Sequence, residues 1–376
     1  DMADGQTESG AIARVAPSVF IDPRENGGPA WADAVIICPW IVYRCYGDTR
    51  LLERHYESMR GFITYLENNS KDYIYAYEGS LWQGFGDWLS INAETPKDLL
   101  GTAFFAYSVS LMEKIAGVLG KIEDAKYFSV LGDTVKEAFQ KKFVSEDGQV
   151  ANGTQTACVL ALHFGLVKEK DRPTILNTLV ADIEKRCMQL STGFVGCSYL
   201  PHALSNEGRL DVAYALLKQT KWPSWLYAVT QGATTIWERW DGWTHEKGFQ
   251  AAGMNSFNHY AYGSVGEWLY SVVAGLDIDP DCPGYKKILI RPRPGNVMTY
   301  AKAEYFSIRG SIKVSWKVKS GLFSLEVSIP ANTEAEVWLP TDDMDSVQEN
   351  GEKIECDNGC IRIGSGSYSF QSTYSG

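Results

Sequence analysis

The sequence predicts a mainly α-helical region followed by a small antiparallel β-domain. Apolar residues recur at helical spacing as far as Leu276. Beyond Pro280 they alternate with polar residues, as they do along half-buried strands. Loops rich in Gly, Trp and Asp separate the helical stretches. We therefore expect a helical domain over residues 1–276 and a β-domain over residues 277–376.

Four stretches of the helical region carry apolar residues at steps of three and four, the spacing of one helix face. These stripes are Phe105, Val109, Met112, Ala116 and Leu119; Phe128, Leu131, Val135 and Phe139; Leu176, Leu179, Val180 and Ile183; and Val265, Leu269, Val272 and Leu276. Gly47-Asp48 indicates the end of one helix and the start of another. Pro39 lies inside the apolar run 34–46, so we expect a kink or a late helix start there.

Helices that alternate with such loops suit an α/α toroid. In that fold the helices form the wall, and loops at one end form a pocket. The loops in question are residues 27–29, 84–88 and 237–243. An irregular helical bundle is the alternative that the same pattern allows.

The β-domain begins after a group of prolines that ends the helical region. Apolar and polar residues alternate over 312–318 and again over 323–329, on either side of a turn at Lys319-Ser320-Gly321. This pattern predicts a hairpin with one buried face. Alternation over 335–339 predicts a further strand, and Asn350-Gly351 predicts a turn.

Composition places the chain among globular proteins and excludes several classes of function. Its 376 residues are 45% hydrophobic, 22% charged and 12% aromatic, with 12 Trp and 20 Tyr. This length suits two domains, or one large domain with an appendage. A net charge of −11 without any basic run argues against nucleic-acid binding. No stretch of about 18 apolar residues is present, so we expect no membrane span.

The eight cysteines form no CxxC pair and do not cluster with histidine as zinc ligands would. In a chain of this length, we expect free buried thiols rather than a disulfide framework. That expectation favours a cytoplasmic location. Export stays open, because the sequence starts at Asp1 without an initiator Met or a signal sequence and is expected to begin inside a longer polypeptide.

Motifs for metals, phosphates and nucleophilic serines are missing from the sequence. It contains no P-loop, HExxH, EF-hand or GxSxG motif, and its five histidines are scattered. We therefore predict neither a metal site nor an organic cofactor.

The densest group of chemically useful residues is the segment 231–243. Glu238 lies there between Trp237 and Trp240. Tryptophan faces cover the apolar C–H faces of a pyranose ring, and a carboxylate handles protons or hydroxyls, so this segment suits sugar chemistry. The structural alternative is a surface glutamate paired with Arg239, with the tryptophans filling the core.

Three further motifs lie at junctions between loops and helices. Asn258-His259-Tyr260 follows the glutamate segment, and Trp31-Ala32-Asp33 and Gly86-Asp87-Trp88 precede it. A lone histidine is usually structural, and aspartate at such a junction is also a good helix N-cap. Because the motifs share one kind of position, a joint site is better supported than any single residue.

Together these motifs resemble those of the inverting bacterial α-L-rhamnosidases, glycoside hydrolase family 78. The matches run in family order from the first residues to about residue 295, and the segment 232–241 is the most specific. The other matching motifs are 28–33 with Pro39-Trp40, 86–89, 192–196, 223–227, 258–261 and 290–292.

The resemblance implies an (α/α)6 barrel followed by a C-terminal β-sandwich. Carried over by position, Glu238 resembles the general base that activates water, and His259 resembles a histidine that binds the sugar. The other residues in pocket-forming motifs are Trp31, Asp33, Asp87, Trp88 and Trp240. The implied reaction is the inverting hydrolysis of rhamnose-containing glycosides or polysaccharides, without a cofactor.

One departure from the family concerns the general acid. Family members carry it in an Asp-Glu-Arg…Gly-Trp…Gly-Asp stretch before a helix, and that stretch is absent here. Residues 1–6 resemble the end of that helix. We therefore expect a C-terminal part of a longer enzyme whose barrel lacks its first helix or helices. The apolar seam left by those helices would promote association, including a homo-oligomer.

Two rival functions remain open from the sequence. One is another (α/α)6 sugar hydrolase, such as a trehalase-like or glucoamylase-like enzyme. The other is a non-catalytic carbohydrate-binding scaffold, which a degenerate parent enzyme would favour.

Overall fold

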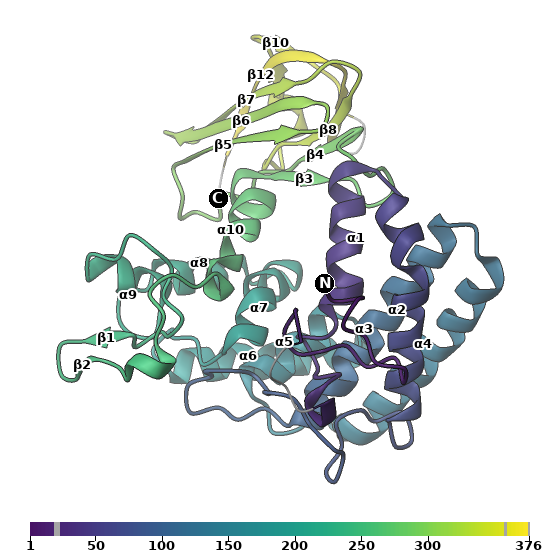
Figure 1. The fold of residues 1–376 in the computed structure, drawn as a ribbon. Coiled ribbons are helices and arrows are strands. Elements are labelled where there is room, and N and C mark those ends of the chain that lie inside the picture. Colours follow the sequence, from purple (N-terminus) through teal and green to yellow (C-terminus); the bar gives the residue numbers. More distant parts are fainter. Residues whose placement is uncertain (19–22, 357–358, 375–376) are drawn as a thin grey trace. The chain divides into compact units, whose positions relative to one another are not determined.

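The computed structural model describes residues 1–18, 23–356 and 359–374. These residues form two compact units (Figure 1), and each is described by itself. The first unit contains residues 1–40 and 49–264, and the second contains residues 41–48 and 265–376.

The first unit is helical. Its main helices are α1 Ala34–Tyr46 (which ends in the second unit), α2 Arg50–Asn68, α3 Lys97–Val118, α4 Ile122–Phe143, α5 Gln155–His163, α6 Arg172–Lys185, α7 Phe194–Asn206, α8 Leu210–Lys218 and α9 Trp225–Thr230. Shorter elements are η1 Pro23–Glu25, η2 Glu169–Asp171, η3 Ala252–Met254, η4 Ala261–Ser264 and the hairpin β1 Trp243–Thr244 with β2 Gly248–Phe249. Helices α3, α4 and α6 confirm three of the predicted stripes.

Burial separates inner from outer helices. Helices α3 and α5 are buried on nearly every side, whereas α2, α4 and α6 each bury one stripe. Helix α3 packs against α2, α4 and α5, and α5 packs in turn against α6 and α7. This alternation is the arrangement predicted for an α/α toroid. Helix α3 is long and apolar enough to cross a membrane by composition, but 78% of its apolar window is buried, as in a core helix.

Helix α1 tests two predictions from the sequence, one at Pro39 and one at Gly47-Asp48. It begins at Ala34 and continues through Pro39, so the expected late start is wrong. Pro39 lies only in the second turn of the helix, where its missing N–H removes a single backbone bond. Gly47, with φ of +68°, ends the helix, and α2 begins at Arg50, as the sequence predicted.

The second unit contains two sheets. One has the strand order β10-β9-β12-β7-β6-β5, and the other has the order β11-β8-β4-β3. The strands are β3 Leu276–Ile278, β4 Lys287–Ile290, β5 Tyr300–Ser307, β6 Gly310–Lys319, β7 Leu322–Ile329, β8 Glu334–Trp338, β9 Gln348–Glu349, β10 Glu352–Lys353, β11 Cys360–Ile363 and β12 Gly366–Thr373. Neighbouring strands are antiparallel except β4 and β8, which are parallel.

The predicted hairpin is confirmed as β6 and β7. Its inward residues, among them Ile312, Trp316 and Phe323, are buried. The predicted strand over 335–339 is β8, and the predicted turn Asn350-Gly351 joins β9 to β10 with both residues at positive φ.

The helical stripe that begins at Val265 belongs to the second unit. It forms α10 Val265–Trp268 and the π-helical turn η5 Leu269–Ala274. Trp316 of β6 donates a hydrogen bond from Nε1 to the Val273 carbonyl at 2.9 Å. The second compact unit therefore includes this stripe, which packs with the sheets. Helical spacing alone does not show which core a stripe joins.

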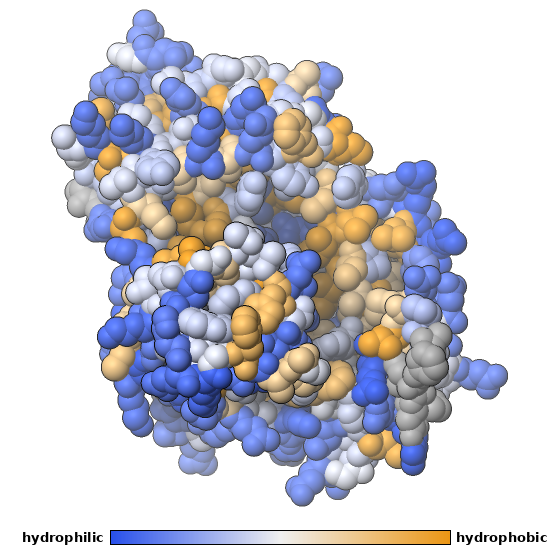
Figure 2. Space-filling view, turned by 60° about the vertical axis from the view of Figure 1, so that its left-hand side comes forward, coloured by the Kyte–Doolittle hydropathy of each residue, from blue (hydrophilic) through white to orange (hydrophobic). Residues whose placement is uncertain are grey.

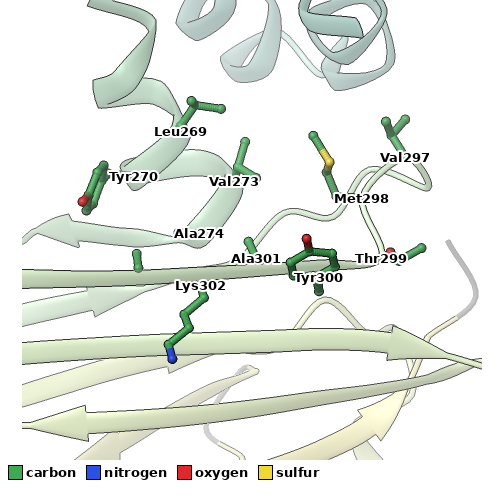
Figure 3. Close-up of a pocket in the computed structure, with 11 residues that line it drawn as sticks. Leu269, Tyr270, Val273, Ala274, Val297, Met298, Thr299, Tyr300, Ala301 and Lys302 are labelled. Carbon is green, nitrogen blue, oxygen red and sulfur yellow. The ribbon is translucent and has the colours of Figure 1, made fainter. Parts of the chain in front are cut away.

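A cavity of about 450 Å³ lies beside η5 and the start of β5 (Figure 3). Its lining is mostly apolar, and Leu269, Val273, Met298 and Tyr300 are among the residues around it. None of the predicted site residues lines it.

The surface is mostly hydrophilic on the face drawn in Figure 2, and most of the cysteines are at least partly exposed. In the view of Figure 2, hydrophilic residues cover most of the surface and apolar residues gather in patches. Helix α1 leaves Ile41 and Tyr46 exposed, at 43% and 54%. None of the eight cysteines, all within the described residues, forms a disulfide, as predicted, but only three of them are buried: Cys158, Cys197 and Cys360.

Candidate functional site

Several of the candidate residues lie near the N-terminal ends of helices in the first unit. Trp31 and Asp33 precede α1, His259 precedes η4, and Asp87 reaches the start of α7. Backbone N–H groups at these ends lack partners within the helix, so the loops must supply acceptors. Hydrogen bonds and ring contacts link the segments that carry these candidates.

Two loop segments, 235–238 and 256–259, hold Glu238 and His259 side by side. The Glu238 N–H donates to the Ser256 carbonyl at 2.9 Å, and the Ser256 N–H donates to Glu238 Oε2 at 2.8 Å. The His259 N–H donates to the Ile236 carbonyl at 2.9 Å. The Thr235 hydroxyl adds a bond to the Phe257 carbonyl. The two predicted principal residues therefore belong to one braced pair of loops.

The half-buried Glu238 carboxylate is held by one oxygen. Its Oε2 accepts the Ser256 N–H, while Oε1 has no hydrogen-bond partner among the described residues. Arg239 pairs with Asp241 at 3.0 Å rather than with Glu238. The alternative of a surface Glu–Arg pair is therefore wrong.

His259 is held in a defined orientation. Its Nδ1 accepts the Ala261 N–H at 3.3 Å, so the neutral ring carries its proton on Nε2. The ring centre lies 4.9 Å from that of Phe194, the first residue of α7, at 41°. The Nε2–H has no protein acceptor within the described part of the chain. It can therefore donate to a ligand hydroxyl.

Trp31 and Trp88 meet across a third ring. The centre of Phe85 lies 5.0 Å from that of Trp31 and 5.6 Å from that of Trp88. Both tryptophans are half-buried, which leaves part of each side chain open to a ligand. The sequence did not single out Trp82 or Arg14, which complete this cluster. The Trp82 ring lies 5.2 Å from Phe85, and the Arg14 guanidinium lies 5.7 Å from the same ring.

Asp33 stabilises the turn that carries Trp31. Its Oδ2 accepts the Ala30 N–H at 2.8 Å, and its Oδ1 accepts the Ser108 hydroxyl at 2.5 Å. Ala30 has a φ of +67°, so the turn is held in a conformation that few non-glycine residues adopt. Asp33 is only 1% exposed, and burial raises its pKa to about 6 against the two hydrogen bonds.

Asp87 is fully engaged with protein donors. Its Oδ1 accepts the N–H groups of Val195 and Gly196 at 2.9 and 3.1 Å. Its Oδ2 accepts the Gly193 N–H at 2.8 Å and the Thr156 hydroxyl at 2.5 Å. Burial raises the pKa of this carboxyl, and the four hydrogen bonds oppose that effect.

Trp240 lies in the core. It is 5% exposed, stacks on Tyr262 at 3.7 Å, and donates from Nε1 to the Thr192 carbonyl at 3.1 Å. Its ring is therefore covered by protein, as the core-filling alternative expected. Its contribution to the site is to fix the loop that carries Glu238.

Metal-binding side chains do not gather here. Within residues 1–18, 23–356 and 359–374, no group of three or more His, Cys, Asp or Glu side chains could hold an ion.

Comparisons with known proteins agree along nearly all of the chain. Residues 1–273 match the model of the bacterial α-L-rhamnosidase six-hairpin glycosidase domain, and residues 275–353 match that of the bacterial α-L-rhamnosidase C-terminal domain. These matches confirm the predicted toroid and the C-terminal β-domain.

Individual relatives share much of the sequence. An α-L-rhamnosidase of Streptomyces avermitilis is 43% identical over 373 residues, covering 98% of this chain and 35% of the relative. One of Formosa agariphila is 36% identical over 392 residues, covering 99% of this chain and 41% of the relative. The chain thus spans well under half the length of the curated relatives it matches.

Solved structures are similar as well. The crystal structure of the Streptomyces avermitilis α-L-rhamnosidase complexed with L-rhamnose matches with a TM-score of 0.91 and 42% identity, covering 99% of this chain and 36% of that one. The α-L-rhamnosidase structure from Dictyoglumus thermophilum matches with a TM-score of 0.89 and 35% identity, covering 99% of this chain and 43% of that one.

Proposed function

The chain belongs to the bacterial α-L-rhamnosidase family, and from this we propose that it forms the sugar-binding and general-base side of a glycosidase site that releases L-rhamnose from α-L-rhamnosides. The relative from Streptomyces avermitilis was crystallised with L-rhamnose, which supports this sugar as the ligand here. Rhamnose-containing glycosides or polysaccharides are the proposed substrates.

The orientation of Glu238 carries the proposal. A general base must keep its carboxylate in place and still have an oxygen free to take a proton from water. Glu238 meets both needs, because Oε2 is held by the Ser256 N–H and Oε1 has no partner among the described residues. We assign it the deprotonation of the water that attacks the anomeric carbon.

The reaction then proceeds with inversion. Water attacks the face of the sugar opposite the leaving oxygen while a carboxylic acid protonates that oxygen. Inverting glycosidases separate the two carboxyl groups by about 6.5–9.5 Å to admit the water. Asp33 and Asp87 are both occupied by protein donors, so we assign neither of them the role of the general acid.

The remaining residues bind the sugar. His259 donates from Nε2 to a ring hydroxyl, because its Nδ1 is already used by Ala261. Trp31 and Trp88 offer half-buried ring surfaces to the C–H groups and the methyl group of the rhamnosyl ring.

The test uses the protein expressed from its complete coding sequence. Hydrolysis of 4-nitrophenyl α-L-rhamnopyranoside is followed by ¹H NMR, and β-L-rhamnose should appear before its anomers equilibrate. Early α-L-rhamnose would overturn inversion. Turnover of the α-D-glucoside instead would favour another (α/α)6 hydrolase, and binding of rhamnose without turnover would favour a carbohydrate-binding scaffold.

A further inference from the structure

We infer that Asp87 is a positioning residue, which places His259 and the Glu238 loop through the N-terminus of α7 and does not contact the sugar itself. This inference rests on the proposed function for its effect on catalysis. Its structural part stands on the hydrogen bonds and ring contacts around α7.

Asp87 caps a helix from a distant part of the chain. The N-cap position of α7 is Gly193, which has no side chain to accept the first N–H groups. Asp87 takes that role for Gly193, Val195 and Gly196. A carboxylate is well suited to this position, because the N-terminal end of a helix carries partial positive charge.

The close approach of the two segments depends on two glycines. A Cβ atom on Gly193 would collide with the carbonyl oxygens of Asp87 and Trp88. A Cβ atom on Gly196 would collide with the Thr156 hydroxyl, which itself donates to Asp87. The start of α7 therefore packs directly against the backbone of Asp87 and Trp88.

Three contacts connect the start of α7 with the candidate site residues. The Phe194 N–H donates to the Trp88 carbonyl at 2.9 Å, and the Phe194 ring packs against His259 at 4.9 Å. The Thr192 carbonyl accepts Nε1 of Trp240, which follows Glu238 by two positions in the sequence. The Asp87 carboxylate thus holds the start of α7, which in turn contacts Trp88, His259 and the loop that carries Glu238.

The same geometry argues against direct contact with a sugar. Asp87 is 7% exposed, and each of its oxygens already accepts two donors. A sugar hydroxyl would have to displace one of these donors. Displacing a buried N–H without replacing its acceptor is costly.

The test compares Asp87→Asn with Thr154→Ala. In Asp87→Asn, an NH₂ group replaces one oxygen and cannot accept the N–H groups that face it. Thr154 caps the neighbouring helix α5 through the Ala157 N–H, and within the described residues its hydroxyl otherwise bonds only Thr95, so it is the matched control. Both changes remove a helix cap, but only Asp87 supports Phe194.

Two measurements are made well below each variant's melting temperature. The first is the ¹H–¹⁵N spectrum of the imidazole groups, with His259 assigned by substitution. The second is kcat/KM on an aryl α-L-rhamnoside, using the protein from its complete coding sequence. We expect Asp87→Asn to shift the His259 signals and to lower kcat/KM by about tenfold or more, since small displacements of catalytic groups are costly. Thr154→Ala should do neither.

Unchanged His259 signals in folded Asp87→Asn would overturn the inference whatever the activity. Shifted signals in a protein whose wild type hydrolyses no α-L-rhamnoside would support the positioning and refute the proposed function. If Asp87→Asn does not fold, Thr156→Val removes only one of the four bonds and should shift the same signals by less. Unchanged signals in that variant would count equally against the inference.

Discussion

Asp33 offers a quantitative test of the electrostatics of this fold. Replacing it by asparagine should stabilise the protein at neutral pH. The carboxyl is 1% exposed, and burial raises its pKa from 3.8 to about 6 despite hydrogen bonds from Ser108 and Ala30. A buried charge that is not matched by a positive partner is costly to ionise.

The sign follows from proton binding. Between about pH 4 and pH 6, the folded protein keeps the Asp33 proton while the unfolded chain has lost it. Stability from this group is therefore fully present below about pH 4 and falls as the pH rises through about 6. A difference of about two pKa units corresponds to about 3 kcal/mol, at about 1.4 kcal/mol per unit.

Asparagine fits the same position without ionising. Its amide oxygen can accept the Ala30 N–H, and the Ser108 hydroxyl can accept from the amide NH₂ instead of donating. The variant should therefore lose the pH dependence of Asp33 while keeping the turn before α1.

Urea unfolding of wild type and Asp33→Asn across pH 4 to 8 measures this effect. The stability of the variant relative to wild type should rise between pH 4 and 7, by up to about 3 kcal/mol. Asp211→Asn is a control of opposite sign, because the Arg209 guanidinium lowers the pKa of Asp211. That variant should be less stable than wild type throughout pH 4 to 8, and the difference should shrink only below about pH 4, so its unfolding is also measured there. A difference between wild type and Asp33→Asn that does not change with pH would refute the reasoning.

Three further predictions concern the site and the isolated chain. In the protein from its complete coding sequence, Glu238→Gln should lower kcat by about 10² to 10⁴ with little change in KM, and near-wild-type turnover would rule out its role as base. His259→Ala or Trp88→Ala should weaken binding of L-rhamnose in calorimetry with an unchanged melting curve, and unchanged affinity would make these residues structural. Residues 1–376 alone should fold, judged by far-UV circular dichroism, yet fail to hydrolyse aryl α-L-rhamnosides. They should also associate in gel filtration, because α1 exposes apolar residues, so a folded monomer with the turnover of the complete protein would contradict both expectations.

Periodic burial explains why two of the helices were predicted, although the stripe in α3 was recognised in a helix that is buried on nearly every side. Helices α4 and α6 bury one face, so their apolar residues recur at helical spacing. Helix α5 is buried on nearly every side, and its sequence QTACVLALH therefore has no polar face to mark the period. Helix α7 contains Gly196 and Pro201, which are poor helix formers, and its start depends on Asp87.

In the second unit, the sequence predicted some strands but not which strands pair with one another. The hairpin β6–β7 could be predicted because a short turn fixes its register. The parallel pair β4–β8 joins segments with the β5–β7 strands between them in the sequence. Alternation identifies a strand and its buried face but does not name its partner, so this pair escaped prediction.

The candidate site also contains features that have a local signal in the sequence and features that depend on distant partners. Glu238 was singled out by its place between two tryptophans and His259 by the resemblance to the rhamnosidase family, and the structure holds the two residues in adjacent loops. The covered ring of Trp240 and the saturated carboxylate of Asp87 depend on Tyr262 and on the start of α7. Partners that distant in sequence leave no local signal.

The motifs Trp31-Ala32-Asp33 and Gly86-Asp87-Trp88 share an arrangement that the sequence alone did not reveal. In each motif the aspartate is buried and accepts hydrogen bonds that fix a loop against a helix start. In each, the neighbouring Trp31 or Trp88 stays half-buried, with part of its ring surface uncovered. Composition treats the carboxylate and the ring as equal candidates for a polyol site, yet burial assigns them different tasks. We propose that the aspartate sets where the loop lies and that the tryptophan contacts the sugar. Substituting the tryptophan should therefore change affinity directly, whereas substituting the aspartate acts through stability and position.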